Sequence, residues 1–343
     1  MRAGYLTAPG KIELRDDPVP EAQAGEVVVR VRVALTDGTD LKAYRRGHPQ
    51  MPMPTRFGHE FSGDVAAAGT GAGDFAPGDA VMGVHSAPCG ACWWCLRGEE
   101  ELCEQVMATK ILGAYAEYIT LPRHIVERNL YHKPLDVPYE TAACLEPLAC
   151  VMHSVERLDA PIDARIAIVG DGGFGILHAL VLTALGFPPP LLLGRRAARL
   201  DVARGCGIAT LDVRGMETGA VAAALRDRSG GRGMDAVVES TGTAAVWEAA
   251  PAFVRRGGTV LLFGGLPGGT HVSFDAGRLH YDELRVVSPF HFGTRAVREA
   301  YDLLCWHRID PLPLISERFV LGDLPAAFAR LDGGDGIKFA IVP

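Results

Sequence analysis

The chain has 343 residues, which is enough for two ordinary domains. Hydrophobic residues make up 48% of it and charged residues 22%, so a large core can form and a globular fold is expected. The net charge of −7, without a long basic block, argues against nucleic acid or an anionic membrane surface as a partner.

Signals for a membrane span or for export are not found in the sequence. The longest apolar tract, ILHALVLTALGF, is too short to cross a bilayer and is followed by three prolines. The amino terminus, MRAGYLTAPG, lacks the apolar segment of a signal peptide. We therefore expect a cytoplasmic protein without a membrane partner, in which the eight cysteines are thiols or metal ligands.

Residues 1 to about 150 are predicted to be rich in β-structure. VVVRVRVAL, at residues 27–35, alternates with a period of two, as a half-buried strand does. Residues 57–83 consist of short apolar pieces separated by glycines. This pattern favours a barrel with tight turns over helices.

The pattern changes near residue 150 to an alternation of strands and helices. RIAIVG at residues 165–170 is a predicted buried strand, and ILHALVLTALG a predicted helix after it. The alternation continues through five further segments: LLLG, AARLDVARGCG, DAVVEST, AAVWEAAPAFV and TVLLFGG. It predicts a parallel sheet that is covered by helices on both faces. Beyond residue 290, TRAVREAYDLLCWH is a predicted helix, and IKFAIV a predicted strand that returns to the first domain.

A glycine-rich turn joins the first strand and helix of this second part. GDGGFG places Gly170, Gly172 and Gly175 in G-x-G-x-x-G spacing. The spacing between a strand and a helix indicates a dinucleotide-binding turn, whose helix amino terminus faces the phosphates. The alternative is a glycine-rich turn that binds no ligand.

The end of the second predicted strand bears on which nicotinamide cofactor is used. An NAD site usually has Asp or Glu there, roughly 20 residues after the fingerprint. Gly194 occupies this position, and Arg195 and Arg196 follow it. With no carboxylate there to repel a 2′-phosphate and two guanidinium groups to bind one, we predict that NADP(H) is preferred over NAD(H). The alternative is that both arginines begin a solvated helix.

Four cysteines are clustered in CGACWWCLRGEEELC with the spacing C-x2-C-x2-C-x7-C: Cys89, Cys92, Cys95 and Cys103. Four thiolates this close suit a tetrahedral zinc ion without an open position, which is a structural site. An iron–sulfur cluster also uses four cysteines, so the spacing leaves that alternative open.

A second candidate metal site is more dispersed. Asp37 lies in ALTDGTDLKAYRRG, His59 and Glu60 lie in FGHEFSG, and Glu146 lies in CLEPLACVMH. One imidazole and several carboxylates can bind a hard or borderline divalent metal ion. For His85, as for other scattered histidines, we expect an ordinary surface or core position.

These motifs, in this order, resemble the zinc-dependent medium-chain alcohol dehydrogenase superfamily, in its polyol, threonine and glucose dehydrogenase branch. DGTD matches the family's C-G-[ST]-D segment and GHEFSG its G-H-E segment; the cysteine lobe, EPLAC and the glycine fingerprint follow. The resemblance covers essentially the whole chain. It implies an α/β protein with a GroES-like β-barrel catalytic domain at residues 1–150 and 291–343. Residues 151–290 would form a Rossmann dinucleotide-binding domain with a doubly wound parallel sheet.

The resemblance also assigns roles by position. Asp37, His59, Glu60 and Glu146 are implied as ligands of a catalytic zinc ion, and the four clustered cysteines as ligands of a structural one. Thr39 matches the hydroxyl that begins the family's proton relay, whereas Lys42 stands where a histidine often continues it. A homodimer or homotetramer is implied, and ELRVVSPF is the candidate strand for joining two Rossmann sheets.

Asp37 stands where the family has a cysteine ligand. A carboxylate oxygen binds zinc at about 2.0–2.2 Å and a thiolate at about 2.3 Å, so one anion replaces another with a small adjustment. The glucose dehydrogenase branch includes members with aspartate at this place. We therefore expect a working metal site that is less selective for zinc. The alternative is a site that no longer binds metal.

The sequence thus predicts a zinc-dependent NAD(P)-linked oxidoreductase that interconverts a secondary alcohol and its ketone by hydride transfer. The expected substrate is a small sugar, polyol, cyclitol or amino alcohol, and the expected catalytic residues are Thr39, Asp37, His59 and Glu60. One alternative is a metal-free NADPH-dependent quinone or enoyl reductase of the same superfamily. Another is a catalytically silent NADPH-binding protein.

Overall fold

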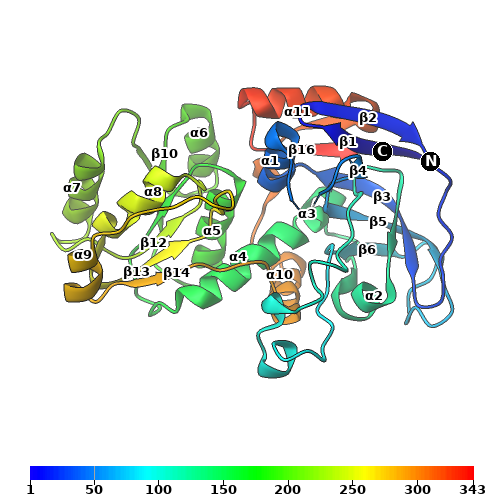
Figure 1. Ribbon diagram of the computed structural model, residues 1–343, viewed down its shortest axis with the longest axis horizontal. Coiled ribbons are helices and arrows are strands. Elements are labelled where there is room, and N and C mark those ends of the chain that lie inside the picture. Colours follow the sequence, from blue (N-terminus) through cyan, green and yellow to red (C-terminus); the bar gives the residue numbers. More distant parts are fainter. Residues whose placement is uncertain (50) are drawn as a thin grey trace. The chain divides into compact units, whose positions relative to one another are not determined.

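A computed structural model describes residues 1–49 and 51–343, and the chain in it divides into two units (Figure 1). Unit 1 comprises Met1–Cys150 and Phe292–Pro343, and unit 2 comprises Val151–His291. Helix α4 (Leu145–Leu158) carries the chain from the first unit into the second.

Unit 1 is built on a sheet that contains seven strands among the described residues, in the order β15-β16-β3-β5-β6-β8, with β7 also paired to β3. These strands are β3 (Val27–Leu35), β5 (Glu60–Ala68), β6 (Ala80–Gly83), β7 (Tyr118–Leu121), β8 (Leu130–His132), β15 (Ile315–Val320) and β16 (Lys338–Val342). β3 is the predicted alternating strand, and its exposed side chains are Arg30 and Arg32. It pairs with three antiparallel neighbours, β5, β7 and β16, which explains why both ends of the strand are fully buried.

A smaller sheet and several helices complete unit 1. The sheet has the order β2-β1-β4, with β1 (Arg2–Ala8), β2 (Lys11–Asp16) and β4 (Thr55–Arg56). The helices are α1 (Gly38–Arg46), α2 (Arg123–Asn129), α3 (Tyr139–Ala143), α10 (Thr294–Cys305) and α11 (Leu324–Gly333). Short 3-10 turns lie at Cys95–Arg97, Glu100–Leu102, Leu312–Leu314 and Leu321–Asp323.

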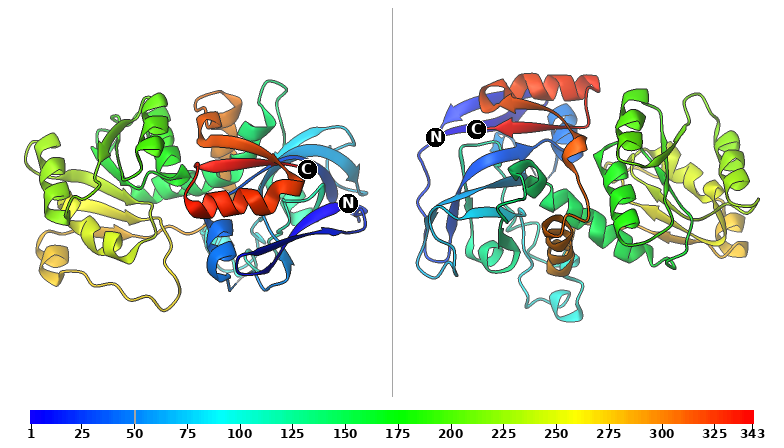
Figure 2. Two further views of the ribbon diagram at one scale, coloured as in Figure 1. Left: turned by 90° about the horizontal axis from the view of Figure 1, so that it is seen from above. Right: turned by 180° about the vertical axis from the view of Figure 1, so that it is seen from behind.

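The carboxyl-terminal segment packs into the core of unit 1. β16 pairs antiparallel with β3, and Figure 2 shows β16 and α11 beside the amino-terminal strands. On α11, the Phe328 ring lies 5.3 Å from the Phe57 ring and 5.7 Å from the Tyr115 ring, centroid to centroid. All three rings are fully buried. This apolar cluster fixes the loop that enters β5, where His59 and Glu60 stand.

Unit 2 is a parallel sheet in the order β11-β10-β9-β12-β13-β14. Its strands are β9 (Ile166–Val169), β10 (Leu191–Gly194), β11 (Ala209–Asp212), β12 (Met234–Glu239), β13 (Val254–Leu262) and β14 (Arg285–Val287). The connecting helices are α5 (Gly173–Ala184), α6 (Ala197–Gly205), α7 (Thr218–Arg228), α8 (Ala244–Ala249), followed by the 3-10 turn Ala250–Phe253, and α9 (Ala276–Tyr281). In sequence order within the unit this is 3-2-1-4-5-6, the doubly wound Rossmann arrangement. The predicted fold class is confirmed.

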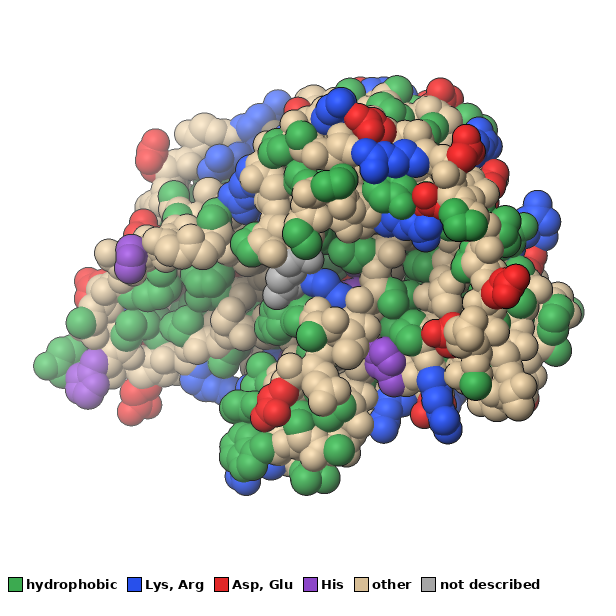
Figure 3. All heavy atoms as spheres, turned by 45° about the vertical axis from the view of Figure 1, so that its right-hand side comes forward, with side chains coloured by type: hydrophobic (Ala, Val, Ile, Leu, Met, Phe, Trp, Pro, Cys, Tyr) green, Lys and Arg blue, Asp and Glu red, His purple; other side chains and the backbone are tan. Residues whose placement is uncertain are grey.

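Charged side chains of both signs are interspersed over the face shown in Figure 3. Exposed ion pairs such as Arg330–Glu317, at 2.6 Å, contribute little to stability because water and salt screen them. Within the described part of the chain, helices that are long and apolar enough to cross a bilayer are not found.

His178 on α5 is a buried, neutral histidine in unit 2. Its Nε2 lies 2.8 Å from Ser154 Oγ and its Nδ1 lies 2.7 Å from the Phe174 carbonyl oxygen. Because a carbonyl can only accept, Nδ1 carries the proton and Nε2 accepts from the serine hydroxyl. Burial lowers the pKa of His178 to about 4, although the bond to Phe174 opposes this effect.

We predict that His178 makes the protein acid-sensitive. Because its pKa is about 4 in the fold against 6.5 in an unfolded chain, the unfolded state binds more protons as pH falls through this window. Between pH 7 and pH 4 the wild type should lose about 3 kcal/mol of unfolding free energy that His178→Gln does not lose. Urea unfolding at both pH values measures this, and parallel losses in the two proteins would contradict it.

Candidate functional site

Two of the four predicted catalytic-metal ligands, Asp37 and Glu146, each turn a carboxylate oxygen toward a nitrogen atom of a third, His59. Asp37 follows β3, His59 precedes β5, and Glu146 lies in the first turn of α4. His59 Nε2 lies 3.8 Å from Asp37 Oδ2 and 4.0 Å from Glu146 Oε2. All three side chains are buried.

The two carboxylate oxygens that face His59 Nε2 have no hydrogen-bond donor among the described residues. A buried carboxylate oxygen without a donor or cation is costly. Burial raises the pKa of Glu146 to about 7, while the His59 imidazole opposes this shift. Burial lowers the pKa of His59, but the charges of Asp40 and Asp37 outweigh it and the net pKa is well above its ordinary value. The donor set and these unpartnered oxygens fit a divalent cation.

Asp37 has a second role that its sequence position already favours. Its Oδ1 accepts the backbone N–H of Asp40 at 2.8 Å and caps α1, while Oδ2 faces His59. Aspartate is a preferred residue at a helix amino terminus. Thr39, the predicted relay hydroxyl, lies half-buried in the first turn of the same helix.

Glu60 is held by a cation from the other end of the chain. Both of its oxygens lie 2.6 Å from Lys338 Nζ on β16, which also donates to the Thr36 carbonyl oxygen at 3.1 Å. Burial lowers the pKa of Lys338, but Glu60 and Asp37 outweigh this, so that the net pKa is raised and the ammonium stays charged. Around His59, the potential metal-ligand atoms fall into two groups. One group is His59 with Asp37 and Asp40, and the other is His59 with Glu60 and Glu146.

Two buried residues that the sequence did not single out lie on the Nδ1 side of His59. Asp40 Oδ1 lies 3.5 Å from His59 Nδ1, and Asp40 Oδ2 accepts a hydrogen bond from the Tyr115 hydroxyl at 2.7 Å. A carboxylate on the second nitrogen of a metal-binding histidine fixes the ring and its tautomer. The signal for Asp40 was its place at the end of DGTD, three residues after Asp37; Tyr115 carried no such signal.

His85 also lies at the site, where the sequence led us to expect an ordinary surface or core residue. It is buried, its Nδ1 lies 3.4 Å from Glu146 Oε1, and its ring packs edge-on against the His59 ring. Cys150, one turn after Glu146 on α4, donates to the same Oε1 at 3.7 Å. Both contacts are to Oε1 of Glu146, while its Oε2 faces His59.

We predict that Lys338→Met lowers the unfolding free energy by about 3–5 kcal/mol, because it leaves the buried Glu60 without its cation. The double variant with Glu60→Gln should recover part of this loss, since it removes the unpaired charge. Urea unfolding at pH 7 measures both. A loss below about 1 kcal/mol in the single variant would show that the pair is not needed for stability.

The clustered cysteines have the geometry of a single-ion site. Cys95 Sγ lies 3.5 Å from Cys92 Sγ and 3.9 Å from Cys89 Sγ, and four cysteine sulfurs lie within 4.8 Å of one another. A zinc tetrahedron with bonds of about 2.3 Å has sulfurs about 3.8 Å apart. Backbone N–H groups point at the sulfurs, and those of Cys95 and Glu104 lower the pKa of Cys92 to about 6. This donor set fits a structural zinc ion.

We expect Cys92→Ser to reduce the zinc content by one equivalent per chain, because a hydroxyl does not replace a thiolate in a four-sulfur site. Cys206→Ser, in unit 2, is the control and should keep the wild-type content. Mass spectrometry of metals in the purified proteins measures both. Equal zinc in the two variants would exclude this site.

The glycine fingerprint forms the turn between β9 and α5. Gly170 has φ +129°, and a Cβ on Gly175 would lie 1.9 Å from the Gly170 carbonyl oxygen, so both positions need glycine. The space beside Gly172 is open. A cavity of about 500 Å³ lies in front of this turn. Its lining includes Gly170, Gly172, Gly194, Arg195, Arg196 and Arg199.

One expectation about this cavity is wrong. The sequence indicated that no carboxylate stands at the end of β10, but Asp171, inside the fingerprint, reaches it. Asp171 Oδ2 accepts the backbone N–H groups of Arg195 at 2.7 Å and Arg196 at 2.8 Å. The sequence distance between these residues hid the contact.

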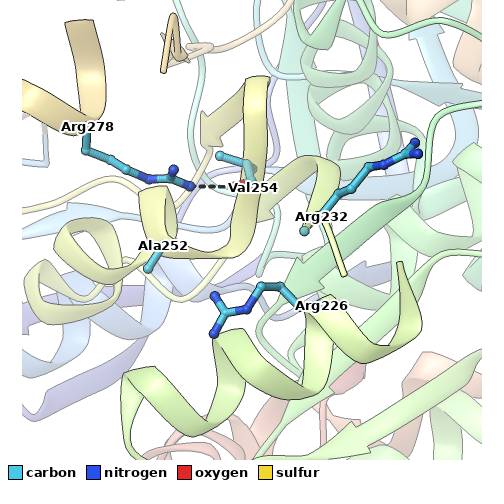
Figure 4. A pocket seen from close by; sticks show the side chains of 6 residues that line it. Arg226, Arg232, Ala252, Val254 and Arg278 are labelled. Carbon is cyan, nitrogen blue, oxygen red and sulfur yellow. Dashed lines mark hydrogen bonds between the residues drawn. The ribbon is translucent and has the colours of Figure 1, made fainter. Parts of the chain in front are cut away.

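A second cavity of unit 2, about 270 Å³, is lined by three arginines, but they do not form a phosphate site (Figure 4). The Arg278 guanidinium donates to the carbonyl oxygens of Pro251, at 3.0 Å, and of Val254. Arg226 and Arg232 point in different directions. The cavity in front of the fingerprint is therefore the better candidate for a dinucleotide.

Comparison with known proteins agrees with this geometry. The alcohol dehydrogenase GroES-like domain matches residues 23–130, and the zinc-binding dehydrogenase domain matches residues 173–306. Sorbitol dehydrogenase of Bacillus subtilis is 27% identical over 336 residues, 96% of this chain and 93% of the relative. D-altritol 5-dehydrogenase of Agrobacterium fabrum is 28% identical over 336 residues, 96% of each chain.

A solved zinc-binding dehydrogenase from Sinorhizobium meliloti, bound to NADP, superposes with a TM-score of 0.89 at 29% identity, covering 100% of this chain and 99% of the other. A parallel Rossmann sheet, a GroES-like domain and a four-cysteine lobe together define a zinc-binding dehydrogenase. The chain belongs to the zinc-dependent medium-chain alcohol dehydrogenase superfamily, in its polyol and threonine dehydrogenase branch. It is therefore an NAD(P)-dependent oxidoreductase of the alcohol dehydrogenase class.

Proposed function

We propose that this enzyme interconverts a secondary alcohol on a polar carbon chain and its ketone, using a catalytic zinc ion held by Asp37, His59 and Glu146, with Glu60 beside it. The observation that carries this proposal is the pair of buried, unpartnered carboxylate oxygens that face His59 Nε2. Relatives named for sorbitol, D-altritol and L-threonine support a polyol, sugar or amino alcohol as substrate.

When bound, the zinc ion would act as a Lewis acid that lowers the pKa of the substrate hydroxyl, and the nicotinamide would exchange the hydride. The chain's own residues position these groups. Asp40, held by Tyr115, places Oδ1 3.5 Å from Nδ1 of His59, while Nε2 on the other side of the ring faces the ligand oxygens. The Thr39 hydroxyl, two residues after Asp37, would accept the proton of the substrate hydroxyl and release its own proton to water.

For the cofactor, we propose NADP(H) in preference to NAD(H). Arg195, Arg196 and Arg199 line the cavity in front of the fingerprint, and guanidinium groups bind phosphate well. The solved relative that contains NADP agrees with this choice. Two zinc ions per chain, one structural and one catalytic, are part of the same proposal.

We also propose a homodimer or homotetramer in the cytoplasm. Strand β14 stands at one end of the unit 2 sheet, and Val286 on it is exposed, as are Tyr281 before it and Phe290 after it. An apolar sheet edge of this kind favours pairing with a second copy. We propose the cytoplasm because that reducing compartment keeps cysteines as thiols or metal ligands.

Asp37 variants test the metal assignment. Asp37→Ala should reduce zinc from two equivalents to one and lower kcat by about a thousandfold, because the Lewis acid contributes several kcal/mol. Asp37→Asn keeps an oxygen for the α1 cap and should be as stable as wild type, whereas the alanine variant loses about 1 kcal/mol of capping. Asp37→Cys should keep two zinc ions.

Metal analysis, urea unfolding and a panel of polyols and ketones with NADP(H) and NAD(H) measure these outcomes. If Asp37→Ala keeps both zinc ions and the rate, the assignment of Asp37 is wrong. One zinc per wild-type chain with reduction of quinones or enones would favour the metal-free reductase. Cofactor binding without turnover would favour a silent NADPH-binding protein.

A further inference from the structure

The carboxylate of Asp171 occupies a position that the sequence alone leaves empty. Asp171 is the second residue of the fingerprint, yet its Oδ2 ends at the carboxyl end of β10, where it accepts from the backbone of Arg195 and Arg196. In Rossmann domains this is the place of the acidic residue that hydrogen-bonds the ribose hydroxyls of NAD. The negative charge is present there, although it comes from the turn that follows β9.

Gly194 makes room for this carboxylate. A Cβ on Gly194 would lie 2.5 Å from Asp171 Oδ2 and 2.6 Å from Asp171 Cβ. Real side chains do not approach so closely, so residue 194 cannot carry a side chain while Asp171 holds its position. The two residues therefore act together: the glycine at the usual acidic position admits the carboxylate from the fingerprint.

Asp171 and three arginines face the same cavity with opposite charges. Arg195, Arg196 and Arg199 line it together with Asp171. Burial and the charge of Arg196 lower the pKa of Arg199, and Asp171 opposes that shift, so these groups interact electrostatically. A carboxylate attracts ribose hydroxyls and repels a 2′-phosphate, which carries about −1.5 to −2 charges. Asp171 also occupies two backbone donors that a phosphate would otherwise use.

We propose that Asp171 is a specificity-determining residue that moderates the preference of the three arginines for NADP(H) and keeps NAD(H) usable. This inference rests on the proposed dinucleotide site in front of the fingerprint. It differs from that proposal because it concerns the ratio of the two cofactor affinities and not binding itself.

Calorimetric titration of the zinc-loaded enzyme with NADP+ and with NAD+ tests the proposal. Asp171→Asn keeps an oxygen for both backbone N–H groups and removes the charge. It should raise the ratio Kd(NAD+)/Kd(NADP+) about tenfold, which corresponds to about 1.4 kcal/mol. Asp171→Ser, which also frees the two N–H groups, should shift the ratio in the same direction by at least as much.

Asp201→Asn is the matched control, because Asp201 is an exposed carboxylate on α6 that pairs with Arg204, outside the lining of the cavity. It should leave the ratio unchanged. An unchanged or lower ratio in folded Asp171 variants would overturn the inference. A ratio Kd(NAD+)/Kd(NADP+) above about a thousand in the wild type would overturn it as well, because NAD(H) would then not be usable. If the wild type binds neither cofactor, the dinucleotide site itself is wrong.

Discussion

The structure of unit 1 depends on how the negative charge around His59 is balanced. Four carboxylates are buried around this imidazole: Asp37, Asp40, Glu60 and Glu146. Removing carboxylates from water is costly unless each meets a cation or hydrogen-bond donors. Lys338 supplies the cation for Glu60, and the Tyr115 hydroxyl donates to Asp40. The oxygens of Asp37 and Glu146 that face His59 Nε2 have no hydrogen-bond donor among the described residues, and the proposed divalent ion would bind there.

The geometry at position 37 also shows how an aspartate could act as the proposed metal ligand in place of the family's cysteine. A carboxylate has two oxygens, so Asp37 caps α1 with one and turns the other toward His59. The same helix start places Thr39 and Asp40, so one local structure sets the proposed metal ligand, the proposed relay hydroxyl and the carboxylate that lies 3.5 Å from His59 Nδ1. A cysteine thiolate has one sulfur atom, which could not accept the capping hydrogen bond and bind the metal ion from two separate atoms as a carboxylate can.

Much of the fold was readable from local sequence patterns. The alternating strand β3, the strands and helices of the Rossmann sheet, the glycine fingerprint and the cysteine spacing all lie within short segments. Helix α1 was not predicted, because its signal was a capping residue that we interpreted as a metal ligand. His85, Tyr115 and Lys338 were missed at the site, because they come from other loops and strands and only packing brings them together.

The sequence by itself determined the order of the elements, the dinucleotide turn and the donor set of the cysteine lobe, since each depends on neighbours within a few residues. Tertiary structure decided the electrostatics. Lys338 meets Glu60 across 278 residues of chain, and the carboxylate of Asp171 fills the place beside Gly194 that appeared uncharged in the sequence. The reason is physical: charges interact through distance in space, and that distance is fixed only when the strands have paired and packed.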